Sequence, residues 1–247
     1  MRYLLKQLVQ QYLRLLTKIV IWRHQPIIIA VTGISNKTTT KMAIVERLRR
    51  LGIEARANPR SFNTEIGLPL AVLYIEPQGR SVAAWIKVLW QGTIIALLGR
   101  QFPKMLVLEF GISQRGDMKK LLNIVKPQAA VFTNVVLSDF NPQTTIDELT
   151  QEMIVLARAI PKTGLAVLNI DDVHLRSLIG VSPGQSVTYG FGEGADIRAV
   201  QIRQESDGLH WQVDNREYTL AKFGEHHLIA ELAAEALIRH AHIRDLS

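Results

Sequence analysis

Residues 27–41 read IIIAVTGISNKTTTK. The first six form an apolar, β-branched run of the kind that a parallel sheet buries on both faces. A strand that feeds a helix through Gly33 would aim backbone N–H groups and the positive end of the helix dipole at an anion. Lys37 could then reach the outer phosphates of a nucleotide, and the Thr38 hydroxyl could join a Mg²⁺ shell. The stretch therefore predicts a phosphate-binding loop between a buried strand and a helix.

This loop departs from the strict pattern at one position. Loops of this class carry Gly immediately before the lysine, whereas this chain carries Asn36. Asn is the non-glycine residue that best tolerates a positive φ, so the departure is a mild one. On the pattern alone, nucleotide binding and an ordinary turn remain open alternatives.

Outward from the loop, apolar runs alternate with helical patterns, which indicates right-handed βαβ units and a P-loop α/β fold with a mostly parallel sheet flanked by helices. From residue 186 the runs are short and broken by Gly, Asp and Asn, which suggests a small antiparallel patch on the sheet edge. The expected helices are 38–51, 117–125, 144–160 and 225–243; the expected strands are 27–32, 53–57, 104–110, 129–135 and 164–170; and the four runs of the patch are 186–191, 196–202, 209–213 and 217–221.

The composition limits the classes of function that the chain can have. The 247 residues are 47% apolar and 21% charged, which is typical of a globular chain with a substantial core. Cysteine is absent, which excludes disulfides, thiolate metal sites and a cysteine nucleophile. Residues 1–45 hold seven Lys and Arg and no acid, and the remaining 22 cations and 22 acids cancel. Because the excess charge sits at the N-terminus, the high overall pI does not indicate nucleic-acid binding.

The first 25 residues have helical periodicity and recurrent cations, so they are neither a signal peptide nor a membrane span. One interpretation is a basic amphipathic helix on the anionic inner face of a membrane, and the other is a helix packed on its own domain. Either way the chain is expected in the cytoplasm. The apolar stretch 81–99 carries Lys87 near its middle and predicts a buried helix. The residues expected on the apolar side of the N-terminal helix are Leu5, Leu8, Tyr12, Leu15, Leu16 and Ile19.

Reactive groups follow several strands, at the sheet edge where α/β proteins bind ligands. Glu109 ends an otherwise apolar strand, and Asp139 follows the next strand. Each acid alone could be a solvated loop residue, but beside Lys37 and Thr38 the pair predicts a Mg²⁺–phosphate site. The irregular stretch 61–70 is either a turn or a part of that site.

The histidines form no metal motif. His226 and His227 are adjacent and are expected to point apart on a helix. His174 and His210 stand alone in the sequence, with no partner at a spacing that binds a metal.

Seven motifs in this order resemble the central, ATP-binding domain of the Mur ligases, and within that family the ligases that add D-alanyl-D-alanine to a UDP-muramoyl tripeptide. The resemblance runs from about residue 26 to 243. The motifs are TGISNKTTTK, FNTEIGLPL, VLEFGISQRGDM, KPQAAVFTNV, GLAVLNIDD, YGFGEGADIRA and FGEHHLIAELAAEAL.

The resemblance implies ATP-dependent amide-bond formation on peptidoglycan precursors through an acyl phosphate. ATP and Mg²⁺ are the implied cofactors. The implied catalytic residues are Lys37, Glu109, Asn63 and Glu65, with Thr64 beside them; the implied Mg²⁺ ligands are Thr38, Glu109 and Asp139; and the implied nucleotide contacts are Gly33, Ser35, Asn36, Lys37, Thr38, Thr39, Asn134, His226 and His227.

Four positions depart from the family pattern. Asn36 replaces a Gly, Asp139 replaces a His, and His227 replaces an Asn that contacts adenine. Met153 aligns, to within about a residue, with the lysine that family members carbamylate to hold a second Mg²⁺. A thioether cannot replace a carbamate oxygen on a hard cation. The resemblance therefore implies a nucleotide-binding core with an incomplete ligase site.

The expected division is an N-terminal helix at 1–25 and a central domain at 26–247, without the flanking domains of the family. The chain is expected to be truncated or part of a split enzyme. Its implied partners are ATP, a UDP-muramoyl peptide, a separate C-terminal ligase domain and an anionic membrane, with no nucleic acid. Two alternatives remain open: a non-catalytic scaffold that kept the fold, and a simple NTPase without an acceptor.

Overall fold

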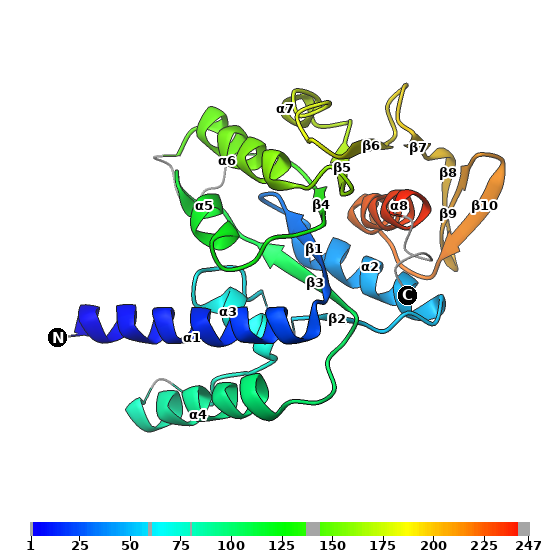
Figure 1. Ribbon diagram of the computed structural model, residues 1–247. Helices are drawn as coiled ribbons and strands as arrows, with labels where there is room; N and C mark the ends of the chain where they lie inside the picture. The colour runs from blue at the N-terminus through cyan, green and yellow to red at the C-terminus, as the bar shows by residue number, and fades with distance from the viewer. Residues whose placement is uncertain (1, 59–60, 80, 137–143, 242–247) are drawn as a thin grey trace.

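A computed structural model describes residues 2–58, 61–79, 81–136 and 144–241 (Figure 1). Its centre is a seven-stranded sheet of order β2-β3-β1-β4-β5-β6-β7, in which every pairing is parallel. This arrangement confirms the predicted α/β class. The strands are β1 Ile27–Thr32, β2 Ala55–Ala57, β3 Met105–Phe110, β4 Ala129–Phe132, β5 Leu165–Asn169, β6 Gln185–Gly190 and β7 Ile197–Arg198.

Two hydrophobic layers cover the sheet because its strands are apolar on both faces. Along β1, Ile28 and Ala30 pack into one layer, and Ile29 and Val31 pack into the other. The first layer comprises α1 Arg2–His24, α3 Gly67–Leu73, α4 Val82–Leu98, α5 Asp117–Leu122, α6 Ile146–Ala159 and α7 Val173–Arg176; the second comprises α2 Lys37–Arg50 and α8 Glu225–His240.

The antiparallel prediction is only partly correct. The runs at 196–202, 209–213 and 217–221 contribute to β8 Val200–Glu205, β9 Gly208–Val213 and β10 Arg216–Leu220, which form a separate antiparallel sheet. The run at 186–191 is instead β6, parallel to β5 and following the α7 crossover. Its Val187 and Tyr189 are buried in the layer that contains α8. β6 is as long as β1, and the Gly, Asp and Asn residues that interrupt this part of the sequence suggested the wrong sheet.

The N-terminal helix forms as predicted, and it packs on its own domain. Leu13, Leu16 and Val20 are buried in the first layer, where α1 contacts α3 and α4. Leu5, Leu8, Tyr12 and Leu15, which share the predicted apolar side, stay exposed. The apolar side is therefore wider than the area that the domain covers.

The prediction of a buried helix at 81–99 is wrong in its burial. α4 forms there, but Val88, Gly92 and Ala96 are its only buried residues, while Ile86, Trp90 and four other large apolar side chains are exposed. The helix is apolar around most of its circumference, and the domain covers one side. Among the described helices, none combines the length and apolar character needed to span a bilayer.

Candidate nucleotide-binding site

The turn between β1 and α2 has the backbone that the loop prediction requires. Gly33 has φ +140°, and a Cβ there would lie 1.9 Å from Thr133 Oγ1, so only glycine fits. Asn36 is the N-cap of α2 and adopts the left-handed conformation, with φ 63° and ψ 4°. Its Nδ2 donates to His226 O at 3.0 Å. Asn36 thus adopts the positive φ that glycine would supply in the family pattern.

Substitutions at Asn36 should show whether the loop requires a residue that tolerates a positive φ. We expect Asn36→Ala to lower the free energy of unfolding by about 1 kcal/mol, because alanine lacks the short polar side chain that lets Asn adopt the left-handed region. Asn36→Gly should lower it by less, because glycine adopts that region freely and only the exposed hydrogen bond to His226 is lost. Urea denaturation of both variants measures the difference. Equal losses would show that the conformation of residue 36 is not what selects Asn.

The end of β4 holds the loop in shape. Asn134 Oδ1 accepts from Ser35 N at 2.9 Å and from Ile34 N at 3.2 Å, and Asn134 Nδ2 donates to Ser35 Oγ at 2.5 Å. Thr133 Oγ1 lies 2.7 Å from Ser35 O, to which it can donate. β4 is the neighbour of β1 in the sheet, so its carboxyl end lies directly beside the loop. These contacts fix the loop backbone before any ligand arrives.

Lys37 and Thr38 are the first two residues of α2, directly after the loop. Lys37 Nζ donates to Gly33 O at 2.8 Å and to Ile34 O at 2.9 Å. Burial lowers the pKa of Lys37, and the negative charge of Glu109 opposes that shift. The Thr38 hydroxyl donates to Glu109 Oε1 at 3.0 Å. The structure therefore brings together three residues that the sequence analysis assigned to one phosphate and Mg²⁺ site.

Glu109 has a partner that the sequence analysis missed. Lys41 Nζ lies 2.7 Å from Glu109 Oε1, and both side chains are 1% exposed. Lys41 Nζ also donates to Asn58 O at 3.1 Å. A signal was present, because Lys41 shares the side of α2 that carries buried Ile44, Val45 and Leu48. A lysine on such a stripe requires a buried counter-ion.

The state of the second carboxylate oxygen of Glu109 indicates whether a cation fits this site. Glu109 Oε2 is buried and has no hydrogen-bond partner among the described residues. An oxygen in that state, next to the Thr38 hydroxyl, matches the hard donors that Mg²⁺ prefers. Asp139, the third predicted ligand, lies outside the described residues. The donors that are described fit one Mg²⁺, with Lys41 already balancing part of the carboxylate charge.

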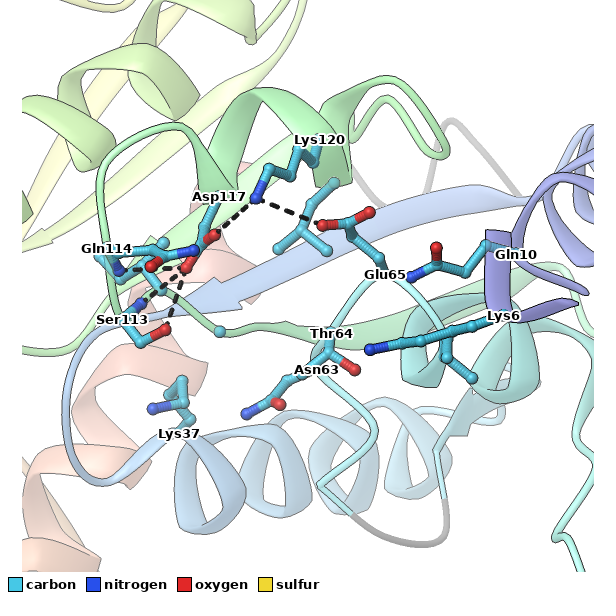
Figure 2. A pocket seen from close by; sticks show the side chains of 14 residues that line it. Lys6, Gln10, Lys37, Asn63, Thr64, Glu65, Ser113, Gln114, Asp117 and Lys120 are labelled. Carbon is cyan, nitrogen blue, oxygen red and sulfur yellow. Dashed lines mark hydrogen bonds and ion pairs between the residues drawn. The ribbon is translucent and has the colours of Figure 1, made fainter. Parts of the chain in front are cut away.

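Two cavities flank the loop. The first, which we term the Lys37 cavity, has a volume of about 440 Å³ and is lined in part by Lys37, Asn63, Thr64 and Glu65 (Figure 2). It thus collects the residues of the irregular 61–70 stretch that were predicted around a reaction centre. Gly111 permits the close approach, since a Cβ there would lie 2.7 Å from the side chain of Asn63.

Charged residues on one wall of the Lys37 cavity hold each other in place. Lys120 Nζ lies 3.4 Å from Glu65 and 3.3 Å from Asp117 (Figure 2). Burial would raise the pKa of Asp117, but hydrogen bonds from Ser113 and Gln114 outweigh it and keep the carboxyl below its usual range. Asp117 therefore stays ionised and anchors Lys120, which orients Glu65 in turn.

The second cavity, which we term the His226 cavity, has a volume of about 570 Å³. Four predicted nucleotide contacts line it together with His226. They are Ser35, Asn36, Thr39 and Asn134. The sequence analysis missed Asn169, Asp171 and Asp172, which also line this cavity and lie at or just after the end of β5. The signal lay in the motif GLAVLNIDD, whose polar end follows a buried strand.

The prediction that His226 and His227 point apart is wrong. Their ring centroids are 4.2 Å apart, because both residues lie in the first turn of α8, directly after Gly224 with φ +96°. Burial and the neighbouring His226 lower the pKa of His227. Only His226 lines the cavity. His227 remains a predicted contact.

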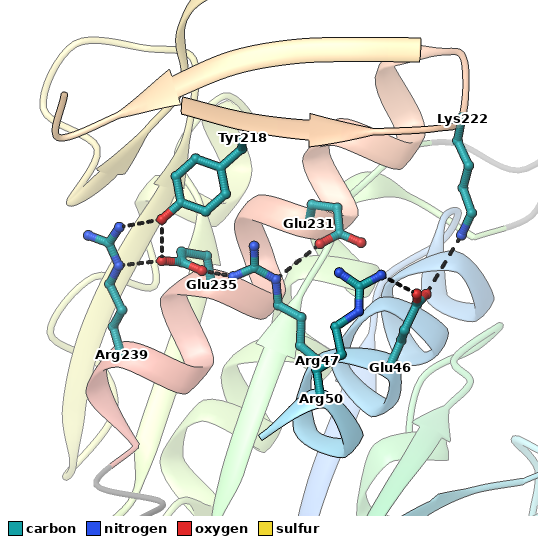
Figure 3. A network of polar contacts seen from close by, with 8 residues as sticks. All are labelled: Glu46, Arg47, Arg50, Tyr218, Lys222, Glu231, Glu235 and Arg239. Carbon is teal, nitrogen blue, oxygen red and sulfur yellow. Dashed lines mark hydrogen bonds and ion pairs between the residues drawn. The ribbon is translucent and has the colours of Figure 1, made fainter. Parts of the chain in front are cut away.

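Polar contacts keep the two helices that begin at the His226 cavity together (Figure 3). Arg47 of α2 donates from Nε to Glu231 Oε2 at 3.1 Å and pairs with Glu235, both on α8. Glu235 also accepts from Tyr218 of β10 at 2.8 Å. We term Arg47, Glu231, Glu235 and Tyr218 the α2–α8 network. Arg47 lies in the last turn of α2, so the network joins α2 to α8 away from the start of α2 at the loop.

Met153 and the remaining histidines line neither of the two cavities. Met153 is 0% exposed and packs in the hydrophobic layer of α6, while its neighbour Glu152 accepts from Gly116 N and Met118 N at the start of α5. The prediction that His210 stands alone is wrong, since His210 Nε2 lies 2.8 Å from Asp207. That pair is at the exposed β8–β9 hairpin, far along the chain from the loop.

Comparisons with known proteins agree with this geometry. The family model described as Mur ligase middle domain matches residues 93–238. The UDP-N-acetylmuramoyl-tripeptide--D-alanyl-D-alanine ligase of Bacillus subtilis is 27% identical over 213 residues, which cover 85% of this chain and 40% of that ligase. The ligase of the same name from Haemophilus influenzae is 24% identical over 219 residues, which cover 86% of this chain and 42% of that ligase.

Solved structures share the fold. MurF from Acinetobacter baumannii superposes with a TM-score of 0.73 at 21% identity, covering 96% of this chain and 47% of that one. The MurF ligase from Thermotoga maritima in complex with ADP superposes with a TM-score of 0.70 at 20% identity, covering 94% and 49%. This chain spans about 40% of the length of the curated relatives it matches. Because the family model matches more than half of its residues, the chain belongs to the Mur ligase family.

Proposed function

We propose that this chain is the ATP-binding part of a ligase that joins a carboxylic acid to an amine through an acyl phosphate. The observation that carries the proposal is the position of the loop between the two cavities. A nucleoside in the His226 cavity would send its phosphates across the loop, so that the γ-phosphate arrives beside Lys37. The ADP complex of the Thermotoga maritima relative supports a nucleotide on this fold.

The Lys37 cavity suits the transfer step. There a carboxylate oxygen of the acyl substrate attacks the γ-phosphorus, the bond from that phosphorus to ADP breaks, and an amine later displaces the phosphate to form the amide. Lys37 supplies a positive charge close to the phosphates, and Asn63 and Thr64 supply polar groups on the facing wall. Glu65 is held by Lys120 and lies at the same cavity. These assignments agree with the roles that the family resemblance implies.

A Mg²⁺ ion fits beside these residues. Thr38 and Glu109 would hold it through the hydroxyl and the unpartnered carboxylate oxygen. The ion would supply positive charge that stabilises the negative charge of the transferred phosphoryl group.

The names of the curated relatives favour a UDP-muramoyl peptide as the acyl substrate and a D-alanyl-D-alanine amine. Because the matches cover about 40% of those relatives, the proposal assigns the UDP-sugar and the amine to other domains. In the enzyme, those domains would close on the two cavities, as a longer chain or as separate partners that include a C-terminal ligase domain.

A second candidate function is a nucleotide-binding scaffold without ligation. It is favoured by the position of Met153, which is wholly buried at the place where the resemblance predicts a Mg²⁺-holding carbamylated lysine. Both functions predict ATP binding. They differ only in whether an acyl substrate accelerates the release of ADP.

ATP binding tests the site that both functions share. We expect calorimetric titration to show Mg²⁺-dependent binding of ATP, and Lys37→Ala to weaken it by about 1.5–3 kcal/mol, the range for a charge-assisted hydrogen bond. Lys119→Ala is the matched control, because Lys119 is exposed and lines neither cavity. If Lys37→Ala binds ATP as tightly as the control, the loop is not the phosphate site.

ADP release by the chain alone tests whether the site is complete. We expect this chain alone to release little or no ADP in response to a UDP-muramoyl peptide, even at high peptide concentration, because the thioether of Met153 cannot hold a second cation. Acyl-phosphate formation needs no amine, so the assay does not depend on a C-terminal domain. A parallel ATP titration on the same preparation shows that the protein is folded. Strong peptide-dependent ADP release would refute the incomplete-site prediction and exclude the scaffold.

A further inference from the structure

The exposed side of α4 is strongly apolar. Val82, Ile86 and Trp90 follow one another at four-residue intervals, and Leu97 and Leu98 extend the same side toward the end of the helix. Trp90 is 67% exposed, whereas Val88 and Gly92 on the opposite side are buried. The side of a surface helix that faces water is normally polar. A helix that is apolar on both sides therefore requires a second apolar environment.

α1 continues this surface. Leu5, Leu8, Leu15 and Trp22 are exposed on it, Trp22 by 77%. The two helices lie side by side at one end of the molecule (Figure 1). Tyr12 and Thr93 lie at the border of the two apolar sides, where their hydroxyls are 2.8 Å apart. The exposed apolar residues of the two helices therefore form one continuous surface, which we term the α1–α4 face.

The charged residues of the two helices are of one sign. α1 and α4 contain no Asp or Glu and together hold six Lys and Arg. Lys6, Lys18, Arg23 and Lys87 are exposed on the helices themselves. A second copy of the chain would bring the same cations face to face, which like-charge repulsion disfavours. An occupant that complements this face must be apolar inside and anionic at its surface.

A lipid bilayer with anionic headgroups has that combination. Helices that lie in its interface carry Lys and Arg beside Leu and Trp, as α1 and α4 do. Trp side chains are enriched at the headgroup level, which suits Trp22 and Trp90 at the outer surface of the two helices. We infer that the α1–α4 face docks in the plane of an anionic lipid bilayer.

Docking would also orient the candidate site. An apolar groove of about 380 Å³ lies between α1 and α4 and is lined in part by Val9, Trp85 and Leu89. Lys6 and Ile66 line both this groove and the Lys37 cavity. The membrane face and the Lys37 cavity are therefore adjacent, and docking brings the entrance of the cavity close to the lipid surface.

Vesicle flotation with the full chain tests the inference. We expect the chain to float with vesicles of phosphatidylcholine and phosphatidylglycerol at low salt, and much less with phosphatidylcholine alone. At about 1 M salt, where the screening length is about 3 Å, binding should fall but not vanish, because the apolar contacts remain. Brominated lipids should quench tryptophan fluorescence, since Trp22 and Trp90 would enter the interface.

Matched variants assign the binding to the face. Trp90→Ser with Leu97→Ser should lower the partition coefficient roughly tenfold or more. Lys18→Glu with Lys87→Glu should lower it roughly thirtyfold or more, about fivefold for each cation removed. The controls are Val173→Ser with Ile179→Ser, exposed apolar residues at α7, and Lys119→Glu. All these residues are exposed, so thermal unfolding should be unchanged in every variant.

Three results would overturn the inference. They are no flotation with anionic vesicles at low salt, flotation that the apolar variants leave unchanged, and a dimer in solution that Trp90→Ser dissociates. The last result would assign the α1–α4 face to a second copy of the chain. Flotation lost in the face variants and kept in the controls would establish membrane docking.

Discussion

Lys41→Met is expected to lower the free energy of unfolding by about 3–5 kcal/mol, the cost of breaking one partner out of a buried ion pair. The substitution leaves the Glu109 carboxylate buried at 1% exposure beside a methionine, with the Thr38 hydroxyl as its remaining described hydrogen-bond partner. The ammonium of Lys41 and its contact with Asn58 O disappear as well. Urea denaturation followed by circular dichroism measures the loss.

Lys120→Met is the matched control for Lys41→Met. Lys120 also makes two carboxylate contacts, but it is 43% exposed and its partner Glu65 is 42% exposed. Exposed pairs contribute at most about 1 kcal/mol, so the control should lose little stability. If Lys41→Met loses no more than Lys120→Met, the Lys41–Glu109 pair does not stabilise the fold.

Glu109 should combine this structural role with a role toward Mg²⁺. In the double variant Lys41→Met with Glu109→Gln, we expect a smaller loss of stability than the sum of the two single losses, because neither charge is left alone. The gain in ATP affinity on adding Mg²⁺ should survive in Lys41→Met, which keeps Thr38 and Glu109, the two described cation donors. It should fall about tenfold or more in Glu109→Gln and in the double variant. If the Mg²⁺-dependent gain in ATP affinity persists without Glu109, this residue is not a ligand of the cation.

The loop could be predicted from the sequence because its signals are local. An apolar run, Gly33 and the pair Lys37–Thr38 lie within a few residues of one another, and the tolerance of Asn for positive φ follows from its chemistry. The φ of 63° at Asn36 agrees with that expectation. The strand–turn–helix unit and its candidate ligand class therefore follow from one short stretch.

The contacts of Glu109 could not be predicted in the same way. Lys41 and Glu109 meet because β1 and β3 are neighbours, with Val31 paired to Glu109. Strand order is decided by the packing of the whole sheet, and no local pattern near either residue reveals it. The exposure of α4 has a similar origin, since hydrophobic periodicity shows which residues are apolar but not how much of the helix its neighbours cover.

Arg47→Ala is expected to lower the free energy of unfolding by about 2–4 kcal/mol, somewhat less than for a fully buried pair because Arg47 is 18% exposed. Its guanidinium contacts both Glu231 and Glu235 and lies 5.5 Å from the centroid of the Tyr218 ring (Figure 3). Removing Arg47 leaves the carboxylates of Glu231 and Glu235 close together. Of these two, only Glu235 is paired with Arg239.

The matched control for Arg47→Ala is Arg50→Ala, one helical turn further along α2. Arg50 pairs with Glu46 at 66% and 45% exposure, so its loss should amount to about 0.5 kcal/mol or less.

The same two variants also test whether the α2–α8 network serves the His226 cavity. α2 and α8 begin at Asn36 and His226, which are joined by a hydrogen bond of 3.0 Å. Loosening the helices should therefore weaken ATP binding several-fold in Arg47→Ala and leave it unchanged in Arg50→Ala. If the folded Arg47→Ala protein binds ATP like the control, the network stabilises the domain without positioning the nucleotide site.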